Sequence, residues 1–480
     1  MLKQCRVNAK MSVINHIDEL NSCFKAQRSA YEQQPYTSYK ARKQKLKALK
    51  QQVLAHQGKL AVAMNQDFGC RNTTESILVD LMTTVGQINY TLSHLKQWMA
   101  PERRHSGILT FPAGVEVHYQ PKGVVGVITP WNYPVFLSLG PLIPAIAAGN
   151  RVMIKMSEYT PHTNQAVAAL IASVFDVNEV AIVEGELEIS QTFSSLTFDH
   201  ILFTGSANVG KAVMKSAADN LVPVTLELGG KSPCILMPDF NLKRFARDFL
   251  LSKTLNSGQT CVAPDTLYCH RSQFEGLITA LKGQYAQNFP SNSQAGDITS
   301  LIHDPHWQRI NDILDDAKDK GANVYPLNDV KVQHKRQMPL TVITDCSEDM
   351  RISQEEIFGP LLPVVLFDDV NEVIEKVNAQ PRPLALYVFT FDINIQRQFL
   401  YQTHSGGVCF NDAAIHVGVE DIPFGGIGDS GMGSYHAEEG FKTFSHAKSV
   451  LIRGRINLTP LFGPPYGRKV HDWLLKLLFR

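Results

Sequence analysis

The sequence has almost no excess of charge of either sign. Its 46 lysine and arginine residues are balanced by 45 aspartate and glutamate residues, for a formal net charge of +1. A chain with so weak an overall field does not attract polyanions, which disfavours nucleic acid as a partner. The basic stretch from Lys40 to Lys50 is therefore interpreted as a solvated helix face.

Cysteine is also scarce, with eight residues in 480 and no C-x-x-C pair. A disulfide framework or a zinc ribbon is therefore not expected. No group of histidine, cysteine and carboxylate residues has a metal-ligand spacing such as H-E-x-x-H, so we expect no metal. Reduced thiols and a cytoplasmic location are the simplest interpretation of this pattern.

Long uninterrupted hydrophobic segments are missing as well. The first twenty residues contain no apolar core of signal-peptide length. Residues 124–149 carry no formal charge and are long enough to span a membrane, but Pro130, Pro134, Pro141 and Pro144 interrupt them. Four prolines would break the hydrogen bonding that a span requires, so we expect a buried strand, a loop and a buried helix, and no membrane span. The short amphipathic C-terminal tail is interpreted as a packed helix, with a weak surface anchor as the alternative.

Hydrophobic residues make up 44% of the chain, which predicts a globular protein with large cores. Periodicity predicts helices at 13–34, 37–57 and 73–98, followed by alternating strands and helices. The predicted strands of this first pattern are 124–129, 151–155, 181–184, 200–204 and 223–228. The predicted helices between them are 135–148, 161–174, 186–195 and 208–219. A second α/β pattern has predicted strands at 234–237, 266–270, 362–367 and 386–391. This alternation predicts two doubly wound, mostly parallel lobes.

Two glycine-rich segments resemble nucleotide motifs. Gly426, Gly428 and Gly431 spell G-x-G-x-x-G, but no strand–helix context surrounds them, so we expect a tight loop. Residues 205–211 read GSANVGK, nearly a P-loop, but Ala212 replaces the Ser or Thr that would hold magnesium, which disfavours an NTPase. A strand precedes this segment and a helix follows, so its backbone N–H groups can bind a phosphate; a structural turn is the alternative.

Two further segments carry candidate chemistry. Glu227 ends a predicted strand in ELGGKSP, and Cys261 follows a predicted helix in NSGQTCVAPD. Parallel sheets bind ligands at the ends of their strands. A lone cysteine is usually structural, and a lone strand-end glutamate is often a salt-bridge partner. Their combination with PWNYP at 130–134 and EEIFGP at 355–360 favours a catalytic site.

With these motifs, together with KMSE, FTGS and IPFGGIGDSGMGSYHAEEGFKTFSH, the chain resembles the aldehyde dehydrogenase superfamily from about residue 35 to 455. The last motif is similar to the class 3 branch, which oxidises aromatic and fatty aldehydes. SGQTCVAPD and LTPLFGPPYGR resemble the bacterial coniferyl-aldehyde dehydrogenase group. The resemblance implies a cofactor domain at 1–226 with an arm strand near 114–122, a catalytic domain at 227–420 and a bridging segment at 421–480.

The family implies three catalytic roles. Cys261 attacks the aldehyde as a thiolate, and an ordinary thiol with a pKa near ~8.5 needs activation for this. Glu227 is the base that deprotonates the thiol or activates water to hydrolyse the thioester. Asn132 and the Cys261 backbone N–H stabilise the oxyanion. If the helix before Cys261 stops near Gly258, its negative end points toward the thiol, so we do not expect its dipole to lower the thiol pKa.

The family also implies a nicotinamide cofactor. The residues expected to bind it are Trp131, Lys155, Glu158, Gly205, Ser206, Gly210, Glu356 and Phe358. Glu158 would repel the 2′-phosphate of NADP, so we expect NAD, although class 3 relatives accept both. Tyr133, Phe136, Ile415 and His416 are expected to line the aldehyde entrance, with simple packing as the alternative.

Three other functions remain to be weighed. A coenzyme A-acylating dehydrogenase is disfavoured by Glu227, because such relatives tend to lack this base. A non-catalytic binding or structural protein is disfavoured by the complete set of Cys261, Glu227, Asn132 and Glu356. The P-loop NTPase is disfavoured by Ala212. The family further suggests a homodimer joined through EVHYQPKG and the C-terminal region.

Overall fold

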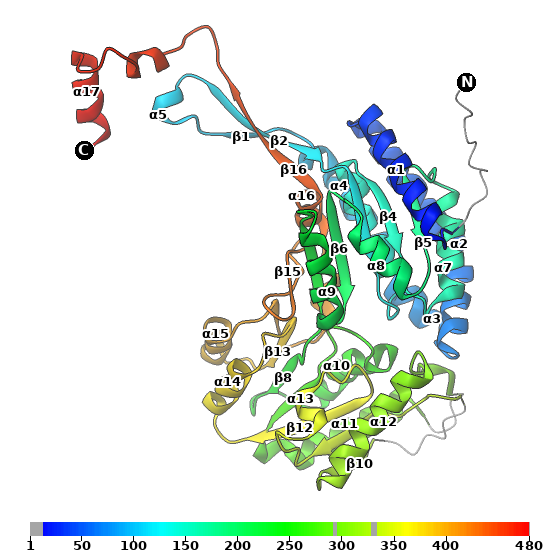
Figure 1. The fold of residues 1–480 in the computed structure, drawn as a ribbon. Helices are drawn as coiled ribbons and strands as arrows, with labels where there is room; N and C mark the ends of the chain where they lie inside the picture. The colour runs from blue at the N-terminus through cyan, green and yellow to red at the C-terminus, as the bar shows by residue number, and fades with distance from the viewer. Residues whose placement is uncertain (1–12, 291–294, 328–333, 480) are drawn as a thin grey trace, which may run out of the picture.

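The computed structural model describes residues 13–290, 295–327 and 334–479, which form three sheets (Figure 1). The first sheet has the order β15-β7-β6-β3-β4-β5. Its strands are β3 (Val124–Ile128), β4 (Arg151–Lys155), β5 (Val180–Val183), β6 (His200–Gly205), β7 (Val224–Leu228) and β15 (Gly431–Met432). The five strands from β7 to β5 are parallel, and β15 is antiparallel to β7. The five predicted strands of this lobe are confirmed to within one residue.

Helices cover both faces of the first sheet. They are α1 (Ile17–Gln33), α2 (Tyr39–Phe68), α3 (Thr73–Ser76), α4 (Met82–Trp98), α6 (Phe136–Ala148), α7 (Pro161–Ala172), α8 (Leu187–Ser195) and α9 (Ala207–Ala218), with a π-helical turn η1 (Ile77–Leu81) before α4. The core that contains α2, α4, α6 and α7 is separate from the core that contains α1, α8 and α9. This two-sided cover is that of a doubly wound sheet, as predicted.

The uncharged segment 124–149 is a buried strand, a loop and a buried helix, as predicted. Every residue of α6 is buried, and Pro141 and Pro144 lie inside this helix. Among the described residues, no helix is both long enough and apolar enough to cross a membrane.

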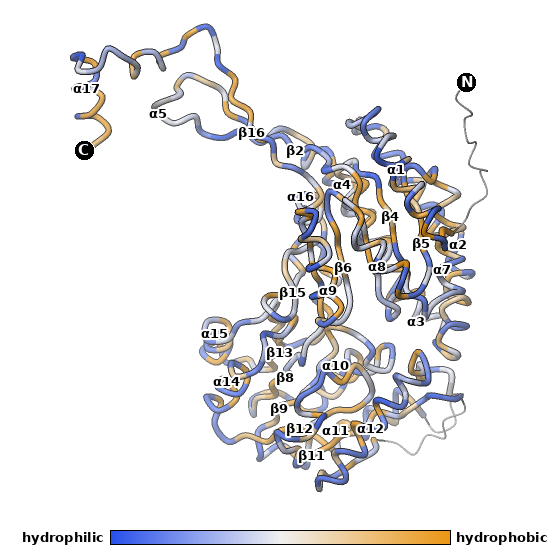
Figure 2. The backbone as a smooth tube through the Cα atoms, viewed as in Figure 1, coloured by the Kyte–Doolittle hydropathy of each residue, from blue (hydrophilic) through white to orange (hydrophobic). Residues whose placement is uncertain are grey.

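The second sheet has the order β10-β11-β12-β9-β8-β13-β14. Its strands are β8 (Pro233–Leu236), β9 (Thr266–His270), β10 (Asn323–Pro326), β11 (Thr341–Thr344), β12 (Leu361–Phe367), β13 (Ala385–Phe389) and β14 (Gly407–Phe410). All neighbours are parallel except β10 and β11. The flanking helices are α10 (Leu242–Thr254), α11 (Phe274–Asn288), α12 (Asp304–Asp319), α13 (Arg351–Gln354), α14 (Val370–Ala379) and α15 (Ile393–Gln402). The central strands of both lobes are hydrophobic along the chain trace (Figure 2).

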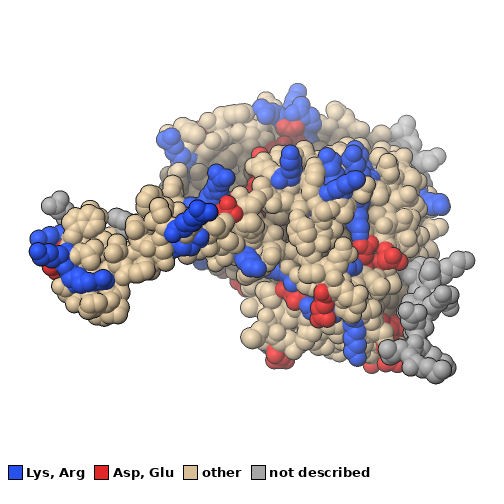
Figure 3. Space-filling view, turned by 90° about the horizontal axis from the view of Figure 1, so that it is seen from above, with Lys and Arg blue, Asp and Glu red and all other residues tan. Residues whose placement is uncertain are grey.

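The third sheet forms an arm that projects from the lobe of the first sheet (Figures 1 and 3). It consists of β1 (Glu102–Arg104), β2 (Gly114–Pro121) and β16 (Ser445–Ile452), all antiparallel. Helix α16 (Ala437–Thr443) leads into β16, and α17 (Lys469–Leu478) lies at the far end of the tail. The expected strand near 114–122 is thus present, and its principal partner comes from the other end of the chain.

The glycine motif at 426–431 is a tight loop, as expected. Gly428 and Gly431 bridge each other, and Gly431 lies opposite Glu227 in the β15–β7 pair. Gly431 has a φ of +140°, and a side chain there would collide with the backbone carbonyl of Leu226. Glycine is therefore required here because the loop packs directly against β7.

Candidate active site

Cys261 lies in a turn that follows α10. Asn256 and Ser257 adopt left-handed φ values of 49° and 54°, and Gly258 follows at 76°, so the helix ends well before the cysteine. The half-buried thiol opens onto a cavity of about 290 Å³, called the thiol cavity below. Burial, reinforced by the charges of Glu356 and Glu227, raises the pKa of the Cys261 thiol to about 12. The free protein therefore holds this group as a neutral thiol at neutral pH.

Glu227 lies on β7 and borders the same cavity. Its side chain is almost completely buried, and neither carboxylate oxygen has a hydrogen-bond partner among the described residues. Burial raises the pKa of Glu227 well above its ordinary value. A buried carboxyl without partners is able to take up a proton, which is the property that a general base needs.

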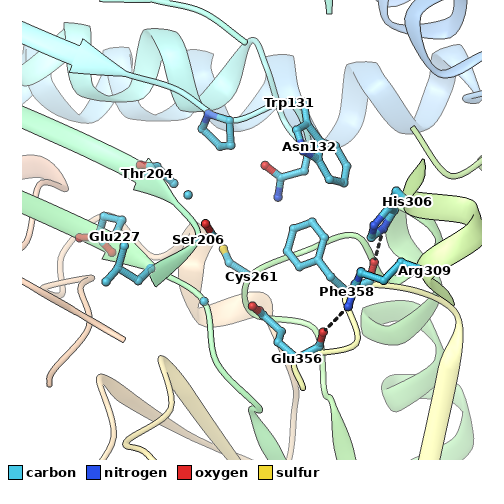
Figure 4. Close-up of a pocket in the computed structure, with 14 residues that line it drawn as sticks. Trp131, Asn132, Thr204, Ser206, Glu227, Cys261, His306, Arg309, Glu356 and Phe358 are labelled. Carbon is cyan, nitrogen blue, oxygen red and sulfur yellow. Dashed lines mark hydrogen bonds between the residues drawn. The ribbon is translucent and has the colours of Figure 1, made fainter. Parts of the chain in front are cut away.

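Asn132 faces Cys261 across the thiol cavity (Figure 4). Its side-chain Nδ2 donates to the carbonyl of Gln259 at 3.2 Å, in the same turn as the thiol. The backbone carbonyl of Asn132 accepts hydrogen bonds from Arg71 Nη1 at 2.9 Å and from Asn256 Nδ2 at 3.0 Å. These bonds hold the Asn132 amide beside Cys261, and its second N–H remains available to a ligand oxygen.

A buried ion pair supports the Asn132 loop. Arg71 Nη2 and Asp80 Oδ2 are 2.8 Å apart with both side chains fully buried, and Asp80 Oδ1 accepts from the Phe136 backbone at 3.0 Å. The Arg71 guanidinium also lies 5.0 Å from the centre of the Tyr133 ring. No sequence motif identified this pair, because charged side chains are usually exposed.

The loop that carries Glu356 is fixed by three charged groups from other segments. Arg309 on α12 donates to the carbonyls of Glu356 at 3.1 Å and Ile357 at 2.5 Å. Lys231 pairs with Asp265 and donates to the Glu355 carbonyl at 2.9 Å. Lys231 belongs to the predicted motif ELGGKSP and Asp265 to SGQTCVAPD. These two motifs therefore also hold the third motif, EEIFGP, in place. Burial raises the pKa of Glu356 to about 7, and the Gly230 backbone N–H opposes this shift.

Aromatic rings also line the thiol cavity. Trp131 lies 5.4 Å from Phe358 and 5.5 Å from His306, centre to centre. His306 Nε2 lies 2.9 Å from the carbonyl of Phe358, which has a left-handed φ of 54°. Sequence reasoning identified Trp131 and Phe358 but not His306 and Arg309, which α12 contributes without a motif.

The predicted cofactor residues fall into two groups. Trp131, Gly205, Ser206, Glu356 and Phe358 line the thiol cavity together with Asn132, Glu227 and Cys261 (Figure 4). Three others are absent from its lining: Lys155, Glu158 and Gly210. Lys155 ends β4, and its Nζ lies 3.9 Å from Glu158 Oε2. Gly210 lies where a Cβ would approach Leu228 Cδ2 to 2.7 Å, which shows a packing reason for glycine in α9.

The thiol cavity suits an anionic dinucleotide. Ser206 precedes α9 and makes no side-chain capping bond, so its hydroxyl and the first N–H groups of the helix remain available beside the cavity. A helix N-terminus of this kind binds phosphate oxygens. The side chain of Glu356 covers Gly229, where a Cβ would collide with its carboxylate. Backbone and carboxylate can therefore both contact a ligand closely.

The residues expected at the aldehyde entrance differ in burial. Tyr133 and Phe136 are buried, and the Tyr133 hydroxyl lies 2.7 Å from Thr260 Oγ1 beside the cysteine. Ile415 is exposed and borders a second cavity of about 680 Å³ between α4 and residues 415–420, called the α4 hollow below. His416 is half-buried, and its ring lies 5.9 Å from Tyr387, whose hydroxyl donates to the Val262 carbonyl at 2.5 Å.

The chain has two α/β lobes, each built on a mostly parallel sheet, and a thiol, a buried carboxyl and an amide line one cavity. This arrangement defines a two-lobed enzyme with a cysteine nucleophile. The aldehyde dehydrogenase family model matches residues 9–450. The chain belongs to the aldehyde dehydrogenase family and is an oxidoreductase that acts on aldehydes.

Similar proteins extend over almost the whole chain. The probable coniferyl aldehyde dehydrogenase of Pseudomonas aeruginosa is 46% identical over 97% of each sequence. The substrate-bound structure of Staphylococcus aureus AldH has a TM-score of 0.91 at 34% identity and covers 96% of this chain and 99% of that one. The NAD⁺ complex of a Mycobacterium tuberculosis aldehyde dehydrogenase has a TM-score of 0.84 at 27% identity and covers 93% and 92%.

Within the described residues, no group of three or more histidine, cysteine, aspartate or glutamate side chains could hold a metal ion.

Proposed function

We propose that this protein oxidises an aromatic or medium- to long-chain aldehyde, coniferyl aldehyde among the candidates, to the carboxylic acid with NAD. The observation that carries the proposal is the convergence of Cys261, Glu227 and Asn132 on one cavity that Ser206 and Glu356 also line. The name of the Pseudomonas aeruginosa relative supports the aromatic aldehyde. The NAD⁺-bound relative supports the cofactor.

The cofactor residues have distinct proposed tasks. Ser206 and the N–H groups at the start of α9 would hold the pyrophosphate, and Glu356 would bind the nicotinamide ribose. Lys155 and Glu158 bind the adenosine ribose, where the carboxylate of Glu158 would repel a 2′-phosphate; NADP remains the second candidate. Trp131 and Phe358 pack near the nicotinamide ring, and Gly210 lets α9 approach the sheet.

The chemistry begins at the thiol. Glu227 accepts the thiol proton, and the Cys261 sulfur adds to the aldehyde carbon to form a thiohemiacetal. Asn132 and the Cys261 backbone N–H donate to the oxygen that becomes negative. Bound NAD would supply the hydride acceptor, and loss of a hydride from the adduct carbon leaves a thioester on Cys261. Once its first proton has passed to solvent, Glu227 removes a proton from the water that attacks the thioester. The acid is released, and the leaving Cys261 thiolate is reprotonated.

The activity is tested by adding NAD and an aldehyde panel to the purified protein and following the absorbance of the reduced nicotinamide. The panel contains benzaldehyde, cinnamaldehyde, coniferyl aldehyde and decanal, each measured as kcat/KM. We expect absorbance growth with at least the aromatic members and formation of the corresponding acid. Absence of growth with all four would support the binding-protein alternative. Growth that requires added coenzyme A would support the acylating alternative.

We also infer a cytoplasmic homodimer joined through the arm and the C-terminal segment. The arm and the tail beyond it expose Leu451, Ile452, Ile456 and Leu458, and apolar side chains grouped in this way are typical of a contact surface. The seven described cysteines are all free, which suits a reducing compartment. Light scattering after size exclusion tests the dimer, and the double variant Leu451→Lys, Ile452→Lys should run as a monomer.

A further inference from the structure

The α4 hollow contains a carboxyl group that has no internal partner. Glu420 borders the hollow, and its Oε2 is covered by protein without a hydrogen-bond partner among the described residues. The adjacent Asp421, in contrast, accepts a hydrogen bond from the Tyr90 hydroxyl. Burial raises the pKa of Glu420 to about 7. A desolvated and unpaired carboxyl is unfavourable in the free protein, and a ligand hydroxyl would relieve this cost.

The remaining walls of the hollow suit an aromatic ring. Met82 and Ile415 face it from opposite sides, from α4 and from the short 3₁₀ helix η5 (Ile415–Gly418), and Val419 lies next to Glu420. All three side chains are exposed, although each is apolar. Methionine and branched aliphatic side chains pack favourably against ring faces. The hollow thus combines an apolar surface with one acid at its edge.

Contacts through His416 and Tyr387 link the α4 hollow with the cysteine turn. His416 follows Ile415 of the hollow, and its ring lies 5.9 Å from the ring of Tyr387. The Tyr387 hydroxyl donates to the carbonyl of Val262, the residue after Cys261. The charges of Glu227, Cys261 and Glu420 also all raise the pKa of the buried Tyr435 phenol, after burial itself.

We propose that Glu420 is a specificity-determining residue that selects aromatic aldehydes with a hydroxyl group at the end remote from the aldehyde. The inference rests on the proposed function and adds the chemical feature that the enzyme recognises. A hydroxyl can donate to the carboxylate and accept from the carboxylic acid, so it pairs with Glu420 in both protonation states. A carboxylate-bearing aldehyde would be repelled, and an unsubstituted ring would leave the acid unpaired.

The test compares 4-hydroxycinnamaldehyde with cinnamaldehyde, which differ in this hydroxyl alone. We expect the wild-type protein to favour the hydroxylated aldehyde by ~10-fold or more in kcat/KM, because a site with a buried polar group discriminates against a substrate that lacks its partner. Glu420→Leu should bring the ratio of the two values close to one. Glu420→Gln retains a hydrogen-bonding side chain and should give an intermediate ratio. Asp421→Asn, whose parent carboxylate already has a partner, is the matched control and should keep the wild-type ratio.

An equal ratio in the wild-type protein and Glu420→Leu would overturn the assignment, as would a ratio lowered as much by Asp421→Asn. A measurement of aldehyde binding distinguishes failure of the Glu420 assignment from failure of the proposed function. Calorimetry of 4-hydroxycinnamaldehyde with the Cys261→Ala protein, alone and combined with Glu420→Leu, needs no turnover. Weaker binding by ~10-fold in the double variant would support selection by Glu420 even if no aldehyde were oxidised. Identical affinities would contradict it.

Discussion

The thiol cavity and the α4 hollow each contain a half-buried glutamate whose pKa is raised to about 7, but the two glutamates are supported differently. In the thiol cavity, the Glu356 loop is held by Arg309, Lys231 and Asp265, and the Gly230 N–H faces its carboxylate. In the α4 hollow, Glu420 has a covered oxygen that finds no hydrogen-bond partner in the described part of the chain. The first cavity is thus built for a ligand of fixed chemistry, whereas the second leaves one group to be satisfied by the substrate.

The largest effect should come from Cys261→Ala, because the proposed reaction proceeds through this thiol. We expect aldehyde oxidation to fall by ~10⁴-fold or more, since the covalent pathway is lost. Reduced-nicotinamide formation measures this loss. NAD binding, measured by calorimetry, should stay close to the wild-type affinity. Turnover at the wild-type rate would contradict the role of Cys261 as the nucleophile.

Glu227→Gln should lower kcat by ~10²–10⁴-fold, the usual contribution of a general base. Burial raises the pKa of Glu227, so its active carboxylate form is lost as the pH falls through that raised value, and wild-type activity should fall with it. The variant should lose this part of the pH dependence of kcat and keep the part that belongs to Cys261. A wild-type rate with an unchanged pH profile would remove Glu227 from the mechanism.

Asn132→Ala should lower kcat by ~10²–10³-fold, because one donor to the oxyanion disappears. The backbone carbonyl of residue 132, which Arg71 and Asn256 contact, is retained in this variant. The melting temperature should therefore change little, and calorimetry checks this. A large loss of stability with a normal rate would assign Asn132 to the fold instead of the reaction.

The smallest effects are expected at Glu356 and Glu420, and they test directly whether the thiol cavity and the α4 hollow have separate tasks. Glu356→Gln should raise the KM for NAD by ~10-fold, the scale of one hydrogen bond to a charged group, and leave the ratio of kcat/KM between hydroxylated and unsubstituted aldehydes unchanged. Glu420→Leu should do the reverse. A change in the aldehyde ratio in Glu356→Gln would show that the two cavities act as one site.

Much of the fold could be predicted because the central strands are short apolar runs bounded by turn residues. Strand β15 has only two residues and β16 is largely exposed, so neither carries such a pattern. Strands β10, β11 and β14 have four residues each and were also missed. The strand between 223 and 228 was predicted correctly, but the expected domain boundary at residue 226 falls inside it.

The candidate site was predictable where motifs carry it. Cys261, Glu227, Asn132 and Glu356 stand in recognisable segments, and the structure brings them to one cavity. Arg309, His306 and the Arg71–Asp80 pair could not be found in this way, because each reaches the site through packing between distant segments. The same holds for Glu420, since a glutamate in a loop is exposed on average. The roles of Lys155, Glu158 and Gly210 in cofactor binding remain predictions.

The position of β15 beside Glu227 has a consequence for the synthesis of the protein. The ribosome makes the strand that carries the base some two hundred residues before the segment that pairs with it, and β2 likewise waits for β16. Domains fold as they emerge, at ~5–20 residues per second, so both edges stay open for many seconds. A chain that stops before residue 431 would contain every residue assigned to catalysis, yet its base would face solvent. Nascent chains should therefore become active only when nearly complete.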